Sequence, residues 1–235
     1  MKISACLRTS VFTAVLTLLA CTSSDIRKGT VALELGDYRM AIQFFSRVLN
    51  RHPDHFEARL GMGKALLQQA VDNRNDSTSW RRAIMQFEAA RTVNSRADVH
   101  RLISQVWSER AYGLLLHAGD TLQALEALTE AIAADPRSPE PLNLAGIIYF
   151  RTGNTRKAKL LFERVLTIDT SNASSLFNLG MVYWKQQQTG EAHDFWLKAL
   201  KHAPDDEDFL YWFALAEKNL RKSTPSSVTR EGEGE

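Results

Sequence analysis

Residues 139–171, PEPLNLAGIIYFRTGNTRKAKLLFERVLTIDTS, recur in altered form as residues 173–206, ASSLFNLGMVYWKQQQTGEAHDFWLKALKHAPDD. Residues of the same kind stand 34 positions apart, namely Gly146 and Gly180, Tyr149 and Tyr183, Ala158 and Ala192, and Phe162 and Trp196. A further step of 34 residues toward the N-terminus reaches Tyr112, Leu115, Ala124, Leu128 and Pro136. Self-similarity at a constant period of this length indicates a repeat architecture, in which each unit stacks on its neighbours.

The spacing within one period resembles a known family. The pattern of a tetratricopeptide repeat is closely matched by Leu176, Leu179, Gly180 and Tyr183, followed by Ala192, Trp196 and Pro204. The resemblance implies an all-α fold, a right-handed superhelical solenoid of about five helix pairs plus a C-terminal capping helix. We expect units at about 22–55, 56–97, 105–138, 139–172 and 173–206, with the cap helix over 207–222.

Two interruptions disturb the register in the first half of the chain. The polar stretch 71–78, VDNRNDST, separates the two helices of the second unit by eight residues more than the period requires. About seven extra residues near 96–102 are predicted to extend the next helix at its N-terminal end. The first helix is expected to begin near Asp25, with Ser23 or Ser24 as its cap, because Ser favours that position. That start leaves a linker of three or four residues after Cys21.

Small residues at equivalent positions predict where paired helices cross closely. Gly146, Gly180, Ala158 and Ala192 leave room there, and Tyr149, Tyr183, Phe162 and Trp196 are expected to fill the space around them. Three further glycines, Gly36, Gly119 and Gly153, suit the tight turns between the two helices of a unit.

The end of the array is predicted from residues 207–222, EDFLYWFALAEKNLRK, an amphipathic stretch. Its inward positions are expected to be Phe209, Leu210, Phe213 and Leu220, and the acidic residues before it, Asp205 and Asp206, favour a helix start. The tail 223–235, STPSSVTREGEGE, holds too few apolar groups to fold and is predicted to be disordered.

Residues 1–20 have the pattern of a secretory signal. Lys2 and Arg8 precede an apolar run over 11–20 that, as a helix of about 15 Å, is too short to span a bilayer. The end of this run, Leu18-Leu19-Ala20-Cys21, resembles a bacterial lipobox, which implies cleavage before Cys21 and acylation of that residue, palmitate included. The alternative is an ordinary signal peptide. By analogy with such lipoproteins, Thr22 rather than Asp implies the outer membrane, facing the periplasm, over the cytoplasmic membrane.

Composition narrows the classes of function. Removing residues 1–20 takes two basic and no acidic residues from 29 Lys plus Arg and 27 Asp plus Glu, which leaves a formal charge of zero. A neutral chain gives no reason to expect nucleic acid as a partner. Cys6, the other of the two cysteines, lies in the removed segment, so we expect no disulfide framework, cysteine-based metal site or cysteine nucleophile.

No motif for catalysis is found. The stretch 61–65, GMGKA, lacks the first glycine and the Ser or Thr of a phosphate-binding loop, so its glycines are better explained by helix packing. His52 and His55 flank Pro53 in a predicted turn, where a surface role is favoured over a metal site. We therefore expect a protein that is not an enzyme and that has no metal or cofactor.

The inner face of a repeat array is the usual binding surface, and the first helix of each unit lines it. Residues between the packing positions are the candidate groove residues: Asn143, Ile147, Phe150, Arg151, Phe177, Asn178, Met181, Trp184, Lys185, Tyr211 and Trp212. Such a mixture is typical of protein interfaces, and Asn178 resembles an asparagine that binds peptide backbone in this family. Core packing is the alternative for Phe177 and Trp184.

Together these features predict a membrane-anchored scaffold for protein–protein interaction. It resembles envelope lipoproteins of the family that assemble pili, outer-membrane complexes or transport machinery, and it would hold a protein or peptide in the concave groove. Two other classes remain open. One is a transporter-associated periplasmic subunit that binds a small ligand in an enclosed pocket. The other, less favoured, is an enzyme on a repeat scaffold, which would need buried titratable groups.

Overall fold

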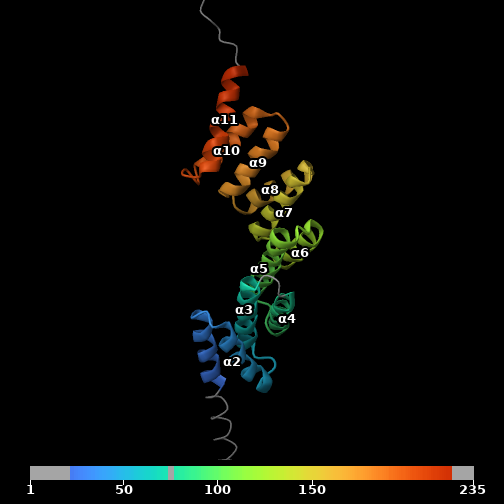
Figure 1. The fold of residues 1–235 in the computed structure, drawn as a ribbon, viewed down its shortest axis with the longest axis vertical. Coiled ribbons are helices and arrows are strands. Elements are labelled where there is room, and N and C mark those ends of the chain that lie inside the picture. Colours follow the sequence, from blue (N-terminus) through green and yellow to red (C-terminus); the bar gives the residue numbers. More distant parts are fainter. Residues whose placement is uncertain (1–21, 74–76, 224–235) are drawn as a thin grey trace, which may run out of the picture. The chain divides into compact units, whose positions relative to one another are not determined.

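In a computed structural model, which describes residues 22–73 and 77–223, these residues form helices and turns and no strand (Figure 1). The first helical stretch covers residues 22–34. The elements that follow are α2 (Tyr38–Arg51), α3 (Phe56–Asp72), α4 (Ser77–Val93), α5 (Ala97–Gly113), the π-helical η1 (Leu114–Ala118), α6 (Thr121–Ala134), α7 (Pro139–Arg151), α8 (Thr155–Ile168), α9 (Ala173–Lys185), α10 (Thr189–Leu200) and α11 (Glu207–Ser223). The predicted signal peptide, the lipidation site Cys21 and tail residues 224–235 lie outside the described residues.

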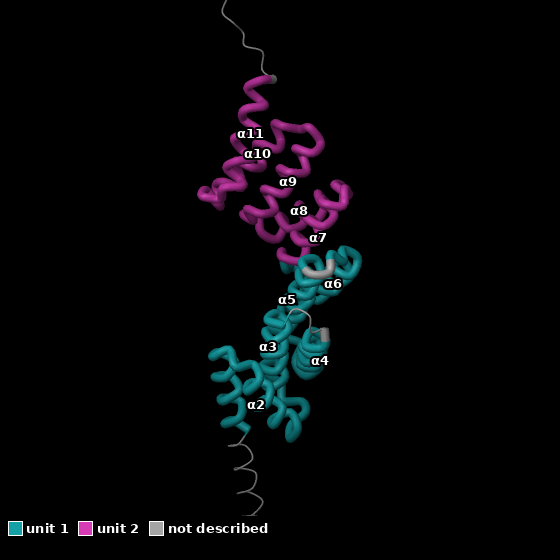
Figure 2. The backbone as a smooth tube through the Cα atoms, in the orientation of Figure 1, with its two compact units in different colours: residues 1–138 teal, residues 139–235 magenta. Residues whose placement is uncertain are grey.

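The predicted all-α architecture of successive helix pairs is confirmed. The chain forms two compact units, residues 1–138 and 139–235 (Figure 2). In the first unit, each helix from α2 to α6 packs on the next one along the chain, and in the second unit the same holds from α7 to α11. Neighbours in sequence are therefore neighbours in space within each unit, as expected for a repeat array.

Glycines opposite aromatic rings bring the helices of the first unit close together. A Cβ atom on Gly29, in the first helical stretch, or on Gly61, in α3, would lie less than 3.0 Å from the ring of Phe45 in α2. Gly63 of α3 has the same relation to Phe87 of α4. The rings are buried and fill the space that the missing side chains leave. The glycines of the stretch 61–65 thus serve helix packing, as predicted.

The second unit repeats this contact twice. Gly146 of α7 faces Phe162 of α8, and Gly180 of α9 faces Trp196 of α10, again with less than 3.0 Å between an added Cβ and the ring. Phe162 and Trp196 are almost completely buried. These four residues are the ones that the 34-residue period predicted to lie at the helix crossings, and the contact is confirmed.

The first helical stretch begins earlier than predicted. Residue 22 is already helical, so Ser23 and Ser24 lie within the helix and the expected linker before Asp25 is wrong. Thr22 and Asp25 are buried, and the Asp25 carboxylate accepts a hydrogen bond from Arg51 of α2 at 3.3 Å. Packing on α2 therefore stabilises an additional helical turn at residues 22–24, where the sequence pattern predicted only a helix cap.

The two interruptions of the repeat, both within residues 1–138, lengthen helices. Helices α3 and α4 have 17 residues each, against 13 in α7 and 14 in α8, so both ends of the inserted stretch 71–78 are helical. Helix α5 begins at Ala97 and continues through η1 to Ala118, which confirms the predicted N-terminal extension.

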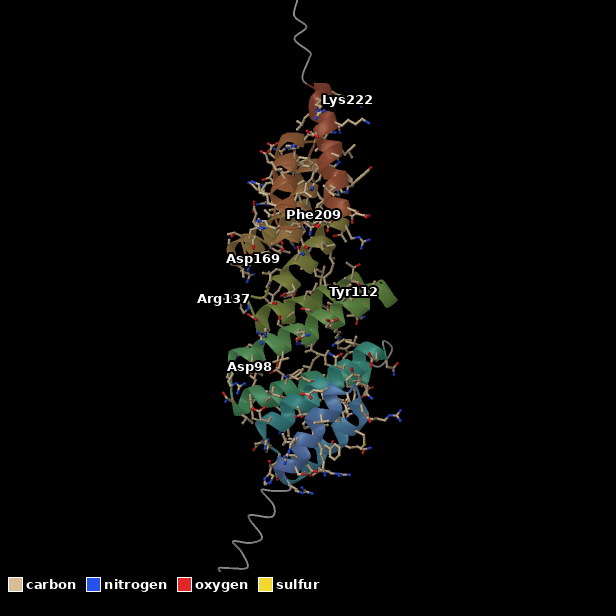
Figure 3. The ribbon with its side chains drawn as sticks, turned by 90° about the vertical axis from the view of Figure 1, so that its left-hand side faces the viewer. Asp98, Tyr112, Arg137, Asp169, Phe209 and Lys222 are labelled. Atoms are coloured by element: carbon tan, nitrogen blue, oxygen red, sulfur yellow. The ribbon has the colours of Figure 1, made fainter. Side chains whose placement is uncertain are left out.

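The cap helix α11 covers the last pair with one face. Phe209 and Ala216 are buried, and Trp212 and Phe213 pack beside Ala216 (Figure 3 labels Phe209). Leu210, which was predicted to point inward, is 46% exposed, so that prediction is wrong. The buried positions follow Phe209 at intervals of three and four residues, and the position directly after it falls on another face.

Turn geometry agrees with the predicted glycines. Gly36, Gly119 and Gly153 adopt positive φ angles of 77°, 62° and 87°. The equivalent turn between α9 and α10 is made by Gln187, at a φ of 62°. Left-handed backbone is unfavourable for a residue with a Cβ atom, so this last turn is the strained member of the series.

The residue after each turn caps the next helix. Side chains of Asp37, Asp120 and Asn154 accept a hydrogen bond from the backbone N–H three residues further on. Asp206 does so for α11, at 3.0 Å from the nitrogen of Phe209, which confirms the predicted acidic helix start. Gln188, at the start of α10, makes no such bond. The turn before α10 therefore lacks both the left-handed glycine and the capping side chain that the other turns have.

Candidate functional site

The predicted groove residues come from α7, α9 and α11, all in the second unit. Helix α9 packs against α7 as well as against α10, and α11 packs against α10. None of the eleven predicted residues is fully buried. The most exposed are Arg151, Lys185 and Tyr211, and the others are partly buried. The set therefore forms a surface of which some members also pack against the core.

Three polar side chains connect α7 and α9 at the centre of this surface. The Oδ1 atom of Asn143 accepts hydrogen bonds from the Ser175 hydroxyl and from Nδ2 of Asn178, each at 3.2 Å. Ser175 is fully buried, whereas both asparagines are partly exposed. An amide nitrogen carries two N–H groups and an amide oxygen two lone pairs. Asn143 and Asn178 therefore keep N–H donors, and Asn178 keeps its oxygen, for a further partner.

Two cationic residues line the surface at equivalent positions of successive repeats. Arg151 is the last residue of α7 and Lys185 the last of α9. The Lys185 ammonium lies 5.0 Å from the centroid of the Phe150 ring, a cation–π contact, and both cations remain exposed. Positive charge is also favourable at these helix C-termini.

Tryptophans dominate the end of the surface next to the cap helix. The ring centroids of Trp184, Trp196 and Trp212 lie 5.7 to 6.0 Å from one another. Trp196 is completely buried, and its indole N–H donates to the Phe177 carbonyl at 3.0 Å. Beside them Tyr211 is 62% exposed and meets Trp212 edge to face at 5.6 Å. Trp184 and Trp212 thus help to hold α11 in place.

Other apolar members of the predicted groove also contribute to packing. Phe177 stacks on Phe209 of α11 with 4.4 Å between ring centroids. Met181 packs beside Trp196, and Ile147 and Phe150 pack against a core cluster of α8 and α9. The part of the surface that is open to a partner is therefore formed by Asn143, Asn178, Arg151, Lys185 and Tyr211.

Sequence reasoning missed Ser175, which ties Asn143 to the start of α9. The bond joins residues 32 positions apart, so the 34-residue period gives no signal for it. The one available indication was a hydroxyl directly before Leu176, a residue of the repeat pattern, because a polar group that becomes buried needs a partner.

Titratable groups give no catalytic arrangement among the described residues. The ion pair with Arg96 lowers the pKa of Asp98, and the hydrogen bond with Tyr183 raises the pKa of Lys159. The Ser171 hydroxyl and backbone N–H lower the pKa of Asp169. Within residues 22–73 and 77–223, no group of three or more His, Cys, Asp and Glu is placed to hold a metal ion.

No helix in the described part of the chain combines the length and apolar character that a transmembrane span requires.

Successive helix pairs, glycine–ring crossings and a surface of amide, cationic and aromatic side chains define a helical repeat protein with a partly exposed polar and aromatic face. Three matches to family models described as "Tetratricopeptide repeat" cover residues 26–77, 115–166 and 173–206, together more than half of the chain. The chain belongs to the tetratricopeptide repeat family.

Relatives among characterised proteins are distant. The chain is 26% identical over 122 residues to "BBSome complex member bbs-4" of Caenorhabditis elegans, which covers 52% of this chain and 25% of that protein. It is 21% identical over 216 residues to "Tetratricopeptide repeat protein 6" of Homo sapiens, covering 80% of this chain and 40% of that protein. The chain thus spans less than half the length of these relatives.

Solved structures share the fold at low identity. A crystal structure of MamA has a TM-score of 0.52 at 19% identity and covers 89% of this chain and 98% of its own. A tetratricopeptide repeat protein from Parabacteroides merdae has a TM-score of 0.57 at 14% identity, covering 86% and 75%. YrrB, described as a TPR protein with an unusual peptide-binding site, has a TM-score of 0.50 at 18% identity, covering 83% and 90%.

Proposed function

We propose that this protein is a membrane-anchored lipoprotein of the bacterial envelope that acts as a protein–protein interaction scaffold in assembling an envelope complex, such as a pilus, outer-membrane or transport machinery. Membership of the tetratricopeptide repeat family supports the scaffold role. The lipobox-like residues before Cys21 support the anchor, and Thr22 supports the outer membrane, with the repeats facing the periplasm.

The observation that carries the scaffold role is the paired asparagines beside exposed cations. The amide N–H groups that Asn143 and Asn178 retain are suited to backbone carbonyls of an extended peptide, and the Asn178 oxygen to a backbone N–H. YrrB, a structural neighbour, is described as having a peptide-binding site. We therefore expect the partner to present an extended segment to this surface.

The charge of the surface indicates what that segment carries. Arg151 and Lys185 are exposed along the same surface, and no acidic side chain among the described residues forms an ion pair with either. Acidic side chains on the partner would complement them and would raise the association rate more than the affinity. Tyr211, exposed beside Trp212, offers an amphipathic contact of the kind enriched at interfaces.

The tryptophan packing favours a peptide over a small ligand. An enclosed ligand pocket would need Trp184 and Trp212 on its walls, whereas both rings pack against buried Trp196. Binding is then non-covalent and takes place on an open face.

Photo-cross-linking from within the surface tests the scaffold role. A benzoylphenylalanine at Tyr211, in the full chain in native membranes, should cross-link to a defined partner. The matched control is the same group at Leu160, which is 60% exposed on α8. Arg151→Ser with Lys185→Ser should weaken the Tyr211 cross-link while the chain stays folded, with only a small loss of thermal stability from the helix C-termini and the Phe150 contact. Equal cross-linking from both positions, or no effect of the double change, refutes this surface. Trp184→Ala is a poor test, because it also removes core packing.

Acylation tests the anchor separately. Metabolic labelling with a fatty acid should tag the wild-type chain and not Cys21→Ser, and the mass of the purified protein should fit cleavage before Cys21. An unlabelled wild-type chain refutes the anchor while leaving the contact surface standing.

A further inference from the structure

The first helix pair carries an apolar surface with basic side chains. A shallow hollow between residues 22–34 and α2 is lined by Ser24, Arg27, Lys28, Val31, Ala32, Leu35, Asp37, Met40 and Phe44. Leu35 is 80% exposed, Val31 48% and Met40 42%. The last helix pair differs, because its apolar face is covered by α11, which buries Phe209 and Ala216 against it. Contiguous exposed apolar residues of this kind mark a contact site. We call this hollow the N-terminal surface.

Positive charge surrounds these apolar residues. Arg27 and Lys28 lie in the hollow, and the Lys28 ammonium and the Arg47 guanidinium stand 5.9 and 5.3 Å from the Phe44 ring centroid. The acidic group in the hollow, Asp37, already accepts the Met40 N–H as the cap of α2. Among the described residues, none of the three cations forms an ion pair. The surface is therefore complementary to an anionic, partly apolar partner.

We propose that the N-terminal surface rests on an anionic lipid bilayer. The apolar side chains Val31, Leu35 and Met40 would enter the boundary between headgroups and acyl chains, with the cations at the lipid phosphates, as in interfacial amphipathic helices. The position of the N-terminal surface supports a bilayer as its occupant, because the helix that carries the surface is already formed at residue 22, directly after Cys21. The inference rests on the proposed anchor at Cys21 for its strength.

The size of the effect explains why the anchor matters. Three basic side chains near an anionic surface strengthen partitioning by about 150-fold in all, which alone is weak binding. A lipid chain at Cys21, three residues before Ser24 and 14 before Leu35, would supply a high effective concentration, so that the weak contact becomes an intramolecular one. The surface would then set which side of the first pair faces the membrane.

Fluorescence quenching in vesicles tests the proposal. The full chain is produced in a two-membrane bacterium, its acylation is verified by mass, and an environment-sensitive dye is attached at Leu35→Cys. The control dye is at Met85→Cys, which is 60% exposed on α4 of the same unit. Helix α3 packs on both α2 and α4, so this control lies one helix pair away from the N-terminal surface. Vesicles contain phosphatidylglycerol with brominated acyl chains, or phosphatidylcholine alone.

The proposal predicts quenching at least threefold stronger at Leu35→Cys than at Met85→Cys in the anionic vesicles. Arg27→Glu with Lys28→Glu should reduce it to the control level. Equal quenching at both positions, or no response to charge reversal, overturns the proposal. A dimeric mass in detergent with the Leu35→Cys dye shielded would instead assign the surface to a second copy, and would overturn it too.

An unacylated product would refute the anchor and not the surface. The surface is then tested by flotation of the same chain with phosphatidylglycerol vesicles at low salt. Flotation that is lost with Arg27→Glu and Lys28→Glu supports lipid contact, and absence of flotation overturns it.

Discussion

Replacing Gly180 by alanine probes the tightest helix crossing of the second unit. The added Cβ would lie less than 3.0 Å from three atoms of the Trp196 indole. Trp196 is 0% exposed, and its N–H is bonded to the Phe177 carbonyl, so the ring has no open side toward which to move. Overpacking costs typically 1–3 kcal/mol and a lost hydrogen bond about 1 kcal/mol, against a helix-propensity gain of about 1 kcal/mol. We expect a net loss of about 2 kcal/mol of stability.

Urea denaturation followed by tryptophan fluorescence measures this loss, and hydrogen exchange of α9 and α10 localises it. Local measurement is needed because repeat arrays can unfold in parts. The control is Gly190→Ala in α10, where an added Cβ meets nothing within 4 Å. This variant should be as stable as the parent or slightly more stable, since alanine is the better helix former.

A double-mutant cycle with Trp196→Leu isolates the contact. Gly180→Ala should cost less in that background, because the smaller side chain leaves room for the Cβ, and the two changes should be non-additive. If Gly180→Ala leaves stability unchanged, or costs the same with and without the indole, the glycine–ring explanation of these crossings is wrong.

Three further predictions concern turns and polar contacts. Gln187→Gly with Gln188→Asp should raise stability by about 1.5 kcal/mol, because the pair restores a left-handed glycine and a helix cap; unchanged urea midpoints would contradict this. Asn143→Leu should cost about 1–3 kcal/mol by leaving the buried Ser175 hydroxyl without its acceptor, which Ser175→Ala in the same chain should partly relieve. Because hydrogen bonds from Ser171 lower the pKa of folded Asp169 below 3.8, its contribution is present above that pH and is lost as pH falls through the folded pKa. Asp169→Asn should therefore be less stable than the parent to thermal unfolding at neutral pH, and the difference should shrink as the pH falls below 3.8.

The period of 34 residues predicted the parts of the fold that every unit shares. Gly180 and Trp196 could be matched because Gly146 and Phe162 stand at the same spacing, and close helix crossings need small residues in each unit. The turn with Gln187 shows the limit of such matching. Its left-handed backbone follows from the two helices that it joins, although the residue type argues against it.

The candidate site could be predicted only in outline. Helices α7 and α9 followed from the repeat and α11 from an amphipathic stretch, but the division of their residues between packing and exposure did not. Asn143 and Asn178 bond to each other although the period pairs them with Phe177 and Leu144, so no repeat signal marks the contact. Hydrogen bonds between helices depend on the rotamers of individual side chains. The exposure of Phe177 depends on the packing of the cap helix α11, whose Phe209 stacks on it.

The ring of Phe45 has consequences for how this array can change length. Gly146 with Phe162 and Gly180 with Trp196 are each contained in one repeat, so duplication or deletion of such a repeat carries both halves of the contact. Phe45 instead lies against a glycine of its own repeat, Gly29, and one of the next repeat, Gly61. Recombination at the junction between the first two repeats would separate the Phe45 ring from Gly61, so insertions are better tolerated at the other junctions between repeats.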